Sequence, residues 1–409
     1  MRNKKRICLV TPCILPIPAV QGGAIETLVS LLVEQNEIEQ KVDLIVVSNK
    51  NDKAIDISGR YKYTKFIYID NAPPGKGVGQ NVLFRTFCCV LKKQKLLWSL
   101  LKDNCFLLKR NLAIIMSRPD YIVAEGGDYA SFKLLTKLYG LKRVYLHLHH
   151  ELYGNGFLLK TFGNVIAVSE YVRNQYAAGR KKILESSFVV RNCVDEKLFL
   201  RRITSEERRC IRGKLGFDDE DFVLVFCGRM IPEKGVKELV DAVNEIGIFK
   251  IKLLLIGSIN FALGGNSEYL QNVLGIVNKS GGKIKFSGYV PNDKLYKYYQ
   301  AADLQVIPSI CNEAAGLVCL EGILSSLPII ASNSGGMPEY LEDTKNILLD
   351  KPNNISDGSD LEKFVCKLRE TIISIYNNKK MYQEMRYSSN MRQKKFSVKN
   401  YYNEFVDIF

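Results

Sequence analysis

The chain has 409 residues, of which 46% are hydrophobic and 25% charged, and its formal net charge is +15. This length favours two domains, and the composition argues against a disordered chain. The 11 cysteines include no C-x-x-C pair, which argues against a zinc ribbon or redox pair and favours a reducing compartment. No apolar run approaches the ~20 residues that span a bilayer, so we expect a cytoplasmic protein.

Short apolar runs alternate with helical stretches along the first half. Residues 7–10 form the first predicted strand, which leads through a Pro-rich loop to Gly22-Gly23 and a helical stretch. Strands separated by helices pair in parallel, which predicts a doubly wound sheet. The further predicted strands of this half are residues 42–47, 66–69, 121–124, 144–148, 165–168 and 188–191.

The same alternation restarts after residue 195. The predicted strands of the second half are residues 222–227, 252–257, 284–287, 304–307 and 329–331. We therefore predict two α/β domains of the Rossmann-like, doubly wound kind, residues 1–195 and 196–393. The aromatic residues of a C-terminal helix at about 394–409 would pack back on the first domain, although a plain terminal helix of the second domain is the alternative.

Residues 80–118 are basic and amphipathic. The segment contains eight lysines and arginines but only one acid, Asp103. The basic residues are interspersed with leucines, phenylalanines and Trp98. Such a segment is typical of an interfacial helix on an anionic membrane, while a core-facing helix with a basic outer face has nearly equal weight. Nucleic acid is not expected as a partner, because no recognised nucleic-acid-binding motif accompanies the charge.

Two carboxylates eight residues apart follow the predicted strand 304–307. Glu313 would lie in a loop and Glu321 about two turns into a helix. Gly316 allows close approach of a ligand, and the free N–H groups around Leu317 and Val318 suit an anion. Alone, this pattern is also that of a surface helix with two solvated glutamates.

A second basic motif follows the predicted strand 222–227. Gly228 ends that strand, and Arg229 and Lys234 come directly after it, at the edge where open α/β sheets bind ligands. A guanidinium and an ammonium there could neutralise the charge of a departing nucleoside diphosphate. Either residue alone would more often be a solvated surface charge.

Together these motifs resemble the retaining GT-B glycosyltransferases of family GT4, in which two Rossmann-like domains face each other across a cleft. Residues 313–321 resemble the E-x7-E motif, and residues 228–235 the G-R-x-x-x-x-K-G motif. The resemblance covers most of the chain. Its other elements are Gly22-Gly23, the H-x-H of residues 147–149, residues 166–170, residues 192–195, and the S-x-x-G-G-x-P-E turn of residues 332–339.

The resemblance implies a role for each matching residue. Glu321 would bind the ribose and Glu313 the donor sugar, while Arg229 and Lys234 would bind the diphosphate. The backbone of residues 316–318 and of Gly22 and Gly23 would assist them, and the backbone around Tyr289 and Val290 would read the base. It also implies retention of anomeric configuration and no obligatory metal or other cofactor. Ala314-Ala315 depart from the family pattern and suggest a differently shaped sugar pocket.

All three histidines of the chain lie at positions 147, 149 and 150. The resemblance places His149 near the donor sugar, with His150 as a weaker candidate. Strand alternation would leave one face of this cluster structural. Metal binding is a minor alternative, because no Cys or Asp spacing completes a ligand set.

The sequence thus predicts a glycosyltransferase that uses a nucleotide sugar, with UDP-sugar favoured over GDP-sugar. The acceptor would be a glycan, with a lipid-linked bacterial surface polysaccharide intermediate expected at the inner face of the plasma membrane. Two alternatives remain, namely a non-catalytic nucleotide-sugar-binding subunit and a sugar-nucleotide epimerase of similar architecture.

Overall fold

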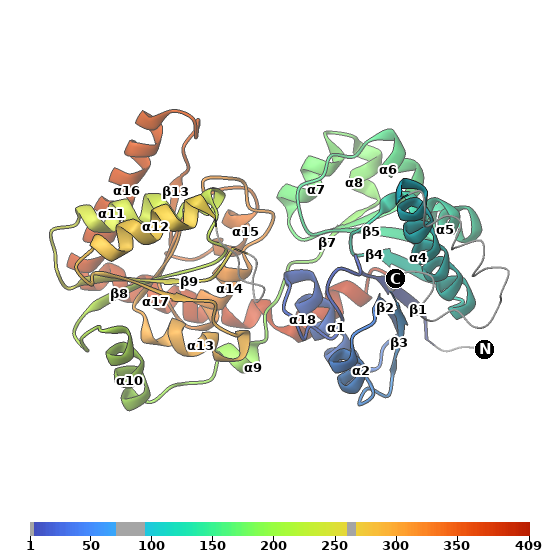
Figure 1. The fold of residues 1–409 in the computed structure, drawn as a ribbon, viewed down its shortest axis with the longest axis horizontal. Helices are drawn as coiled ribbons and strands as arrows, with labels where there is room; N and C mark the ends of the chain where they lie inside the picture. The colour runs from blue at the N-terminus through green and yellow to red at the C-terminus, as the bar shows by residue number, and fades with distance from the viewer. Residues whose placement is uncertain (1–3, 71–94, 260–266) are drawn as a thin grey trace. The chain divides into compact units, whose positions relative to one another are not determined.

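A computed structural model describes residues 4–70, 95–259 and 267–409 of the chain (Figure 1). The chain divides into two compact units. The first unit contains residues 1–167, 173–189 and 402–409, and the second contains residues 168–172 and 190–401. The division therefore falls between Val189 and Val190 rather than after residue 195, and the returning segment begins at Tyr402 rather than at about residue 394.

The first unit is built on a seven-stranded parallel sheet with the strand order β3-β2-β1-β4-β5-β6-β7. Its central strands are buried on both faces, as expected of runs rich in β-branched residues between two helical layers. The strands are β1 (Arg6–Val10), β2 (Asp43–Asn49), β3 (Thr64–Ile69), β4 (Tyr121–Ala124), β5 (Val144–Leu148), β6 (Asn164–Ala167) and β7 (Ser187–Val189).

Helices connect these strands. They are α1 (Ala24–Glu39), α2 (Asp52–Ser58), α4 (Lys95–Ser117), α5 (Phe132–Tyr139), α6 (Gly156–Thr161), α7 (Glu170–Ala177) and α8 (Lys181–Glu185). Several begin at a residue whose side chain accepts a backbone N–H, such as Asn51 before α2 and Asn155 before α6. Such caps satisfy donors that the helix itself leaves unpaired.

The last residues of the chain complete the first unit. Helix α18 (Val398–Val406) brings Tyr402, whose hydroxyl donates to Asn36 Oδ1 at 2.6 Å. The buried Phe409 ring lies 5.2 Å from the Tyr121 ring and 4.9 Å from the Tyr145 ring. These aromatic contacts bury apolar surface that the first 189 residues would otherwise expose.

The second unit is built on a six-stranded parallel sheet with the order β10-β9-β8-β11-β12-β13. Along β8, Val223 and Val225 pack in one core cluster while Leu224 and Phe226 pack in another, so both faces are covered. The strands are β8 (Phe222–Cys227), β9 (Ile251–Ile256), β10 (Ile284–Gly288), β11 (Leu304–Ile307), β12 (Ile329–Asn333) and β13 (Ile347–Asp350).

The helices of this unit lie on both faces of its sheet (Figure 1). They are α9 (Glu196–Phe199), α10 (Ser205–Leu215), α11 (Val236–Glu245), α12 (Glu268–Lys279), α13 (Asn292–Ala301), α14 (Leu317–Leu324), α15 (Met337–Leu341), α16 (Gly358–Asn377) and α17 (Lys379–Arg392). The predicted class, two Rossmann-like parallel-sheet α/β domains, is confirmed.

Each sheet contains one point at which the strand order reverses direction. In the first unit this point lies between β1 and β4, and in the second it lies between β8 and β11. Loops that leave the carboxyl ends of two such strands diverge, and the crevice between them is where open α/β sheets bind ligands. The fold therefore predicts where each unit presents functional side chains.

The basic segment of residues 80–118 is described only from residue 95, and its part at 80–94 lies outside the described residues. One member of the predicted basic face, Arg110, is only 2% exposed. Its guanidinium contacts Ser131 and lies 5.0 Å from the centre of the Phe132 ring. The prediction is therefore wrong for Arg110, which packs inside the first unit.

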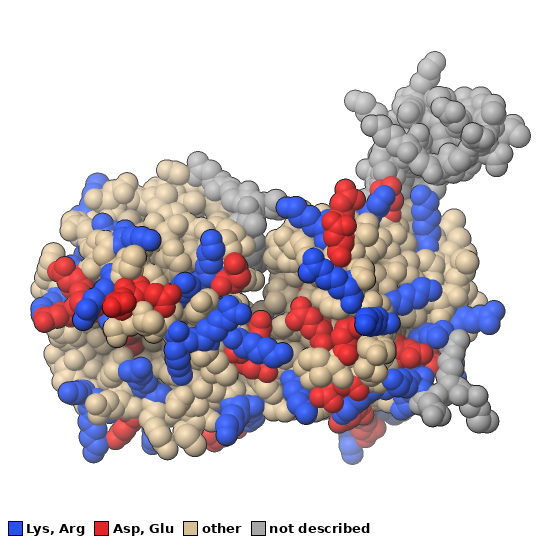
Figure 2. All heavy atoms as spheres, turned by 90° about the horizontal axis from the view of Figure 1, so that it is seen from below, with Lys and Arg blue, Asp and Glu red and all other residues tan. Residues whose placement is uncertain are grey.

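Among the described residues, no helix combines the length and the apolar character needed to cross a membrane. On the face shown in Figure 2, lysines and arginines lie over both units and are mixed with acidic residues. Within each unit, acidic residues therefore interrupt the positive charge that the described residues place on this face.

Candidate functional site

The carboxyl edge of the second sheet brings together the two motifs that the sequence singled out. Lys234 follows β8 and Glu313 follows β11, so they lie on either side of the reversal point. Lys234 Nζ lies 2.6 Å from Glu313 Oε1, and Ser309 Oγ donates to the same oxygen at 2.5 Å. The second oxygen of Glu313 makes no hydrogen bond to the described residues and remains a free acceptor.

A glycine turn after β12 holds the backbone of the Glu313 loop. Gly336 N–H donates to the Glu313 carbonyl at 2.7 Å. Gly335 has φ of 57°, and a Cβ atom there would lie 2.1 Å from the same carbonyl oxygen. Only glycine accepts both that conformation and that approach. The turn therefore fixes the position from which the Glu313 side chain projects.

Helix α14 begins directly after this loop. Gly316 is its N-cap residue, and no side chain caps the helix start. The first intrahelical bond runs from Leu320 N–H to the Gly316 carbonyl at 3.0 Å, so the N–H groups of Leu317 and Val318 precede the ladder. Unpaired N–H groups at a helix start favour an anion.

Glu321 lies about one turn into α14, and not about two turns as the sequence predicted, because the helix begins only at Leu317. Its Oε2 accepts a hydrogen bond of 2.6 Å from the Tyr299 hydroxyl. Burial raises the pKa of Glu321 to about 7, although the bond from Tyr299 opposes this shift. A carboxylate in this setting gains from partners that donate hydrogen bonds, such as the two hydroxyls of a ribose.

The other predicted residues of this unit lie at the same edge. Arg229 is exposed and makes no hydrogen bond or ion pair to the described residues, unlike Lys234. Tyr289 and Val290 follow β10, with Tyr289 39% exposed and Val290 buried. The Gly228 carbonyl lies against Gly257, where a Cβ atom would be only 1.8 Å away. The loops after β8, β10 and β11 thus share one edge.

In the first unit, Gly22 and Gly23 precede α1 and have φ of 79° and 98°. A Cβ atom at Gly23 would lie 2.1 Å from Glu26 Oε2, whereas one at Gly22 would meet no atom within 4 Å. Glu26 is buried, and this burial raises its pKa. Both glycines are therefore favoured by their backbone conformation, and a side chain at Gly23 would also require the Glu26 and Leu15 side chains to move.

The carboxyl ends of β4 and β5 carry a buried polar cluster of Glu125, His147 and His149. His149 Nε2 lies 2.7 Å from Glu125 Oε2. His147 Nδ1 lies 2.9 Å from the same oxygen but forms no hydrogen bond of normal geometry, and neither ring nitrogen of His147 has a partner among the described residues. His150 is exposed.

The protonation states of this cluster follow from its burial and charges. Burial alone would raise the pKa of Glu125, but the influence of His147 and the bond from His149 lower it to about 2. Burial, helped by His147, lowers the pKa of His149 to about 4 despite Glu125. At neutral pH an ionised Glu125 can only accept, so His149 carries its proton on Nε2 and presents Nδ1 as an acceptor.

The same cluster is also the group of described residues that could hold a metal ion. The ligand atoms of Glu125, His147 and His149 all lie within 4.8 Å of one another. Two imidazoles and one carboxylate suit a divalent transition metal. The sequence argument looked for Cys or Asp and missed Glu125, whose position after the neighbouring strand was the available signal.

The structure also adds two residues that the sequence argument did not name. Ser309 and Tyr299 are the direct hydrogen-bond partners of Glu313 and Glu321. Ser309 belongs to the loop that was singled out, but Tyr299 lies on α13, and no local pattern linked it to Glu321.

The fold is shared with known glycosyltransferase structures. The structure of Anabaena HepE in complex with UDP and glucose is similar with a TM-score of 0.69 at 18% identity, covering 98% of each chain. This likeness concerns the fold alone. It agrees with the class that the two parallel sheets define, which is the GT-B fold.

Sequence comparison finds a family similar to part of the second unit. Residues 207–390 match the family described as glycosyl transferases group 1. This segment is less than half of the chain and lies within the second unit.

Two curated relatives match parts of the chain. An uncharacterized glycosyltransferase of Methanocaldococcus jannaschii is 28% identical over 51% of this chain and 53% of its own length. The lipopolysaccharide 1,2-N-acetylglucosaminetransferase of Salmonella typhimurium is 29% identical over 32% of this chain and 36% of its own length. The chain thus spans about half, or less, of the length of these relatives.

Proposed function

We propose that the protein is a retaining glycosyltransferase that transfers a sugar from a nucleoside diphosphate sugar to a glycan acceptor. The observation that carries this proposal is the Lys234–Glu313 pair at the strand-order reversal, beside the uncapped start of α14. The match of residues 207–390 to the group 1 family supports it.

In this proposal the second unit binds the donor through four groups. The N–H groups of Leu317 and Val318 and the unpaired guanidinium of Arg229 hold the diphosphate. Glu321 accepts hydrogen bonds from the ribose hydroxyls. The free oxygen of Glu313 accepts from a sugar hydroxyl, while Lys234 keeps this carboxylate in place and adds positive charge near the leaving group.

The transfer itself needs one bond to form and one to break. The acceptor hydroxyl oxygen attacks the anomeric carbon on the face that the diphosphate leaves, and the bond from that carbon to the diphosphate oxygen breaks. The proton of the acceptor hydroxyl moves to the departing diphosphate. Arg229, Lys234 and the helix start stabilise the charge that grows there, so we propose no obligatory metal. A role for His149 near the donor sugar stays a prediction.

We favour UDP over GDP as the nucleotide, and the structure of HepE in complex with UDP and glucose supports this choice. The test is the thermal stability of the purified protein with UDP, GDP, ADP, CMP and dTDP. A ligand at about 100 times its Kd adds roughly 2.7 kcal/mol to the folded state. We expect a shift with UDP that Glu321→Ala abolishes and that the exposed control Glu362→Ala retains.

The alternatives predict different outcomes. A sugar-nucleotide epimerase would convert the sugar of the matching nucleotide sugar without an acceptor. A non-catalytic subunit would show the nucleotide shift but neither transfer nor slow hydrolysis of the donor. A folded protein with no shift for any nucleotide would contradict the transferase proposal.

We further propose that the acceptor is lipid-linked and that the first unit binds the inner face of an anionic membrane. Three apolar side chains spaced four residues apart on α4 are exposed: Leu108 (56%), Leu112 (50%) and Met116 (81%). Leu134 and Leu138 are exposed on α5, which contacts α4 through Tyr139 and Ile115. The exposed bases near these apolar residues are Lys109, Arg118, Lys133, Lys137, Lys142 and Arg143.

Exposed apolar and basic side chains on neighbouring helices are what an interfacial surface requires. Co-sedimentation with phosphatidylglycerol vesicles at low salt tests this surface. We expect Leu112→Glu to reduce the bound fraction several-fold, whereas Ile355→Glu, at an exposed apolar residue of the second unit, leaves it unchanged. Equal binding by both variants, or no binding by the unaltered protein, would contradict membrane association.

A further inference from the structure

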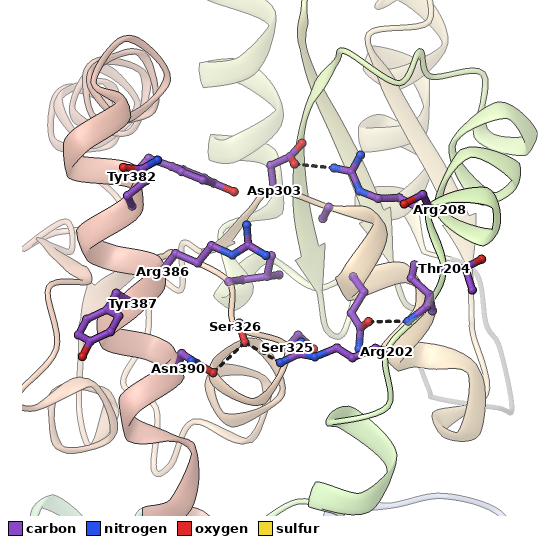
Figure 3. A pocket seen from close by; sticks show the side chains of 16 residues that line it. Arg202, Thr204, Arg208, Asp303, Ser325, Ser326, Tyr382, Arg386, Tyr387 and Asn390 are labelled. Atoms are coloured by element: carbon purple, nitrogen blue, oxygen red, sulfur yellow. Dashed lines mark hydrogen bonds and ion pairs between the residues drawn. The ribbon is translucent and has the colours of Figure 1, made fainter.

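A polar cavity lies at the edge of the second unit's sheet opposite to the proposed donor site. Its volume is about 600 Å³, within the range of small-molecule sites. Asp303 precedes β11, and Ser325 and Ser326 precede β12, so the cavity lies at the amino ends of these strands rather than at their carboxyl ends. Residues from α10 and α17 form its other walls (Figure 3).

The charges of the lining are unbalanced. The lining contains three arginines and one acidic residue, Asp303. Both oxygens of Asp303 are already engaged, with Arg208 at 2.7 Å and with the buried Arg212 at 2.6 Å. Arg202 and Arg386 form no ion pair with any described residue. The cavity therefore carries two uncompensated positive charges.

The polar groups of the lining point to an anion that accepts hydrogen bonds. Figure 3 shows Arg386 reaching from α17 toward the space between Asp303 and Ser326. Arg202 contacts Ser326 Oγ at 3.2 Å from the other side. Ser325 is 5% exposed, and its hydroxyl has no hydrogen-bond partner among the described residues. A buried hydroxyl without a partner is costly unless a ligand satisfies it.

We infer that this cavity binds the phosphate group of a small organic phosphate. A phosphomonoester carries a charge of about −1.5 to −2 at neutral pH, which matches the two uncompensated guanidiniums. The guanidinium fork suits phosphate oxygens, and serine hydroxyls donate to them. The cavity is larger than a phosphate, and Tyr382 on α17, which extends toward Asp303 in Figure 3, offers an aromatic wall for the rest of the molecule.

This site is separate from the proposed donor site. Helix α14 starts at Gly316, where we propose the diphosphate binds, and ends at Ser325, which caps it and lines the cavity. The two sites thus lie at opposite ends of one helix and share no lining residue. The inference does not rest on the proposed transferase activity.

The test is a titration of the full-length protein with inorganic phosphate and with glucose 1-phosphate at constant ionic strength, followed by calorimetry. We expect Arg386→Gln and Ser325→Ala each to weaken binding about tenfold or more. Arg209→Gln on α10 is the matched control, because this arginine is exposed and lies outside the cavity. Lys234→Gln distinguishes phosphate binding in the cavity from phosphate binding at the proposed donor site, because only the latter should weaken in this variant.

A membrane phospholipid is the other source of a phosphate group. Vesicles with and without phosphatidylglycerol distinguish the two sources. If a phospholipid is the ligand, the protein binds vesicles that contain phosphatidylglycerol, Arg386→Gln weakens this binding, and glucose 1-phosphate does not bind. That result would overturn the inference of a small organic phosphate. Binding of each probe that is equal in Arg386→Gln and Arg209→Gln would overturn the inference. UDP binding that persists in Arg386→Gln would show that the proposed donor site is intact, so that such a result would concern the cavity alone.

Discussion

Glu125 is the residue on which the buried cluster of the first unit depends. It is 2% exposed, and its carboxylate is the acceptor for His149 and the neighbour of His147. Because a charged acceptor in a buried site is stronger than a neutral one, its loss leaves the His149 imidazole poorly paired.

We therefore expect Glu125→Gln to lower the free energy of unfolding by about 1.5–3 kcal/mol, the range for hydrogen bonds to charged groups. Urea unfolding followed by circular dichroism measures this change. Glu185→Gln, an exposed glutamate of the same unit, should change it by less than about 0.5 kcal/mol. Equal effects of the two variants would show that the cluster is not stabilising.

Glu321 gives the second unit a dependence on pH. Its pKa in the folded protein is raised by burial to about 7, above the ordinary value of 4.5. The folded state therefore holds a proton that the unfolded state has released between these two values. The contribution of Glu321 to stability is fully present below pH 4.5 and is lost as the pH rises through 7.

Comparison with Glu321→Gln isolates this contribution, because glutamine keeps an acceptor for Tyr299 but does not titrate. We expect the stability of the unaltered protein, relative to the variant, to fall steadily from pH 5 to pH 8. Urea unfolding of both proteins at one-unit intervals provides the measurement. A constant difference across this range would contradict a raised pKa.

At the residue scale, the sequence identified the residues that belong to short local motifs. Glu313 and Lys234 were singled out from their loops, and the structure brings their charged atoms within 2.6 Å of each other. It failed for Glu125 and Tyr299, because each meets its partner only through the order of strands or the packing of a helix. Arg110 was misassigned, since its charge suggested a surface position.

At the scale of elements, the glycine turn after β12 supports the loop that carries Glu313. Gly335 and Gly281 have nearly equal φ angles, 57° and 60°. They differ in their surroundings, because a Cβ atom would clash with Glu313 at the first position and would meet no atom within 4 Å at the second. This pair separates backbone strain from steric clash.

We expect Gly281→Ala to cost about 1 kcal/mol through strain alone, and Gly335→Ala about 3 kcal/mol because the Glu313 backbone must also move. Chemical unfolding of each variant measures these costs. Gly335→Ala should additionally lose the nucleotide-induced shift that Gly281→Ala retains. Similar costs for the two variants would show that the turn does not hold the loop.

The elements themselves were largely predictable. The apolar run at residues 222–227 was predicted as a strand and is β8, because burial on both faces leaves a continuous apolar signal. The terminal strand β13 was missed, since its residues are only half-buried and its pattern is weak. Strand order was not readable, because it depends on which helices cross which face.

At the scale of the whole molecule, we expect each of the two units to have its own free energy of unfolding. Phe405 is fully buried in the first unit, and Phe364 is 2% exposed in the core of the second. Phenylalanine-to-alanine changes in a core cost about 3–5 kcal/mol. Matched substitutions at these two positions can therefore address each unit in turn.

We expect Phe405→Ala to increase hydrogen exchange in the strands of the first unit, and Phe364→Ala in those of the second. Mass spectrometry of peptides from β1–β7 and from β8–β13 measures the two sets. Increased exchange in all strands for either variant would mean that the protein unfolds as one cooperative body.

The division of the first unit also affects its assembly during synthesis. The ribosome adds Tyr402, Phe405 and Phe409 to the chain about 210 residues after β7. At 5–20 residues per second this is a delay of roughly 10–40 seconds. Throughout that interval Tyr121 and Tyr145 lack the aromatic ring that later packs against them. The first unit is therefore translated first but completes its packing last. The sheet of the first unit stays partly uncovered in the nascent chain until the second unit has emerged.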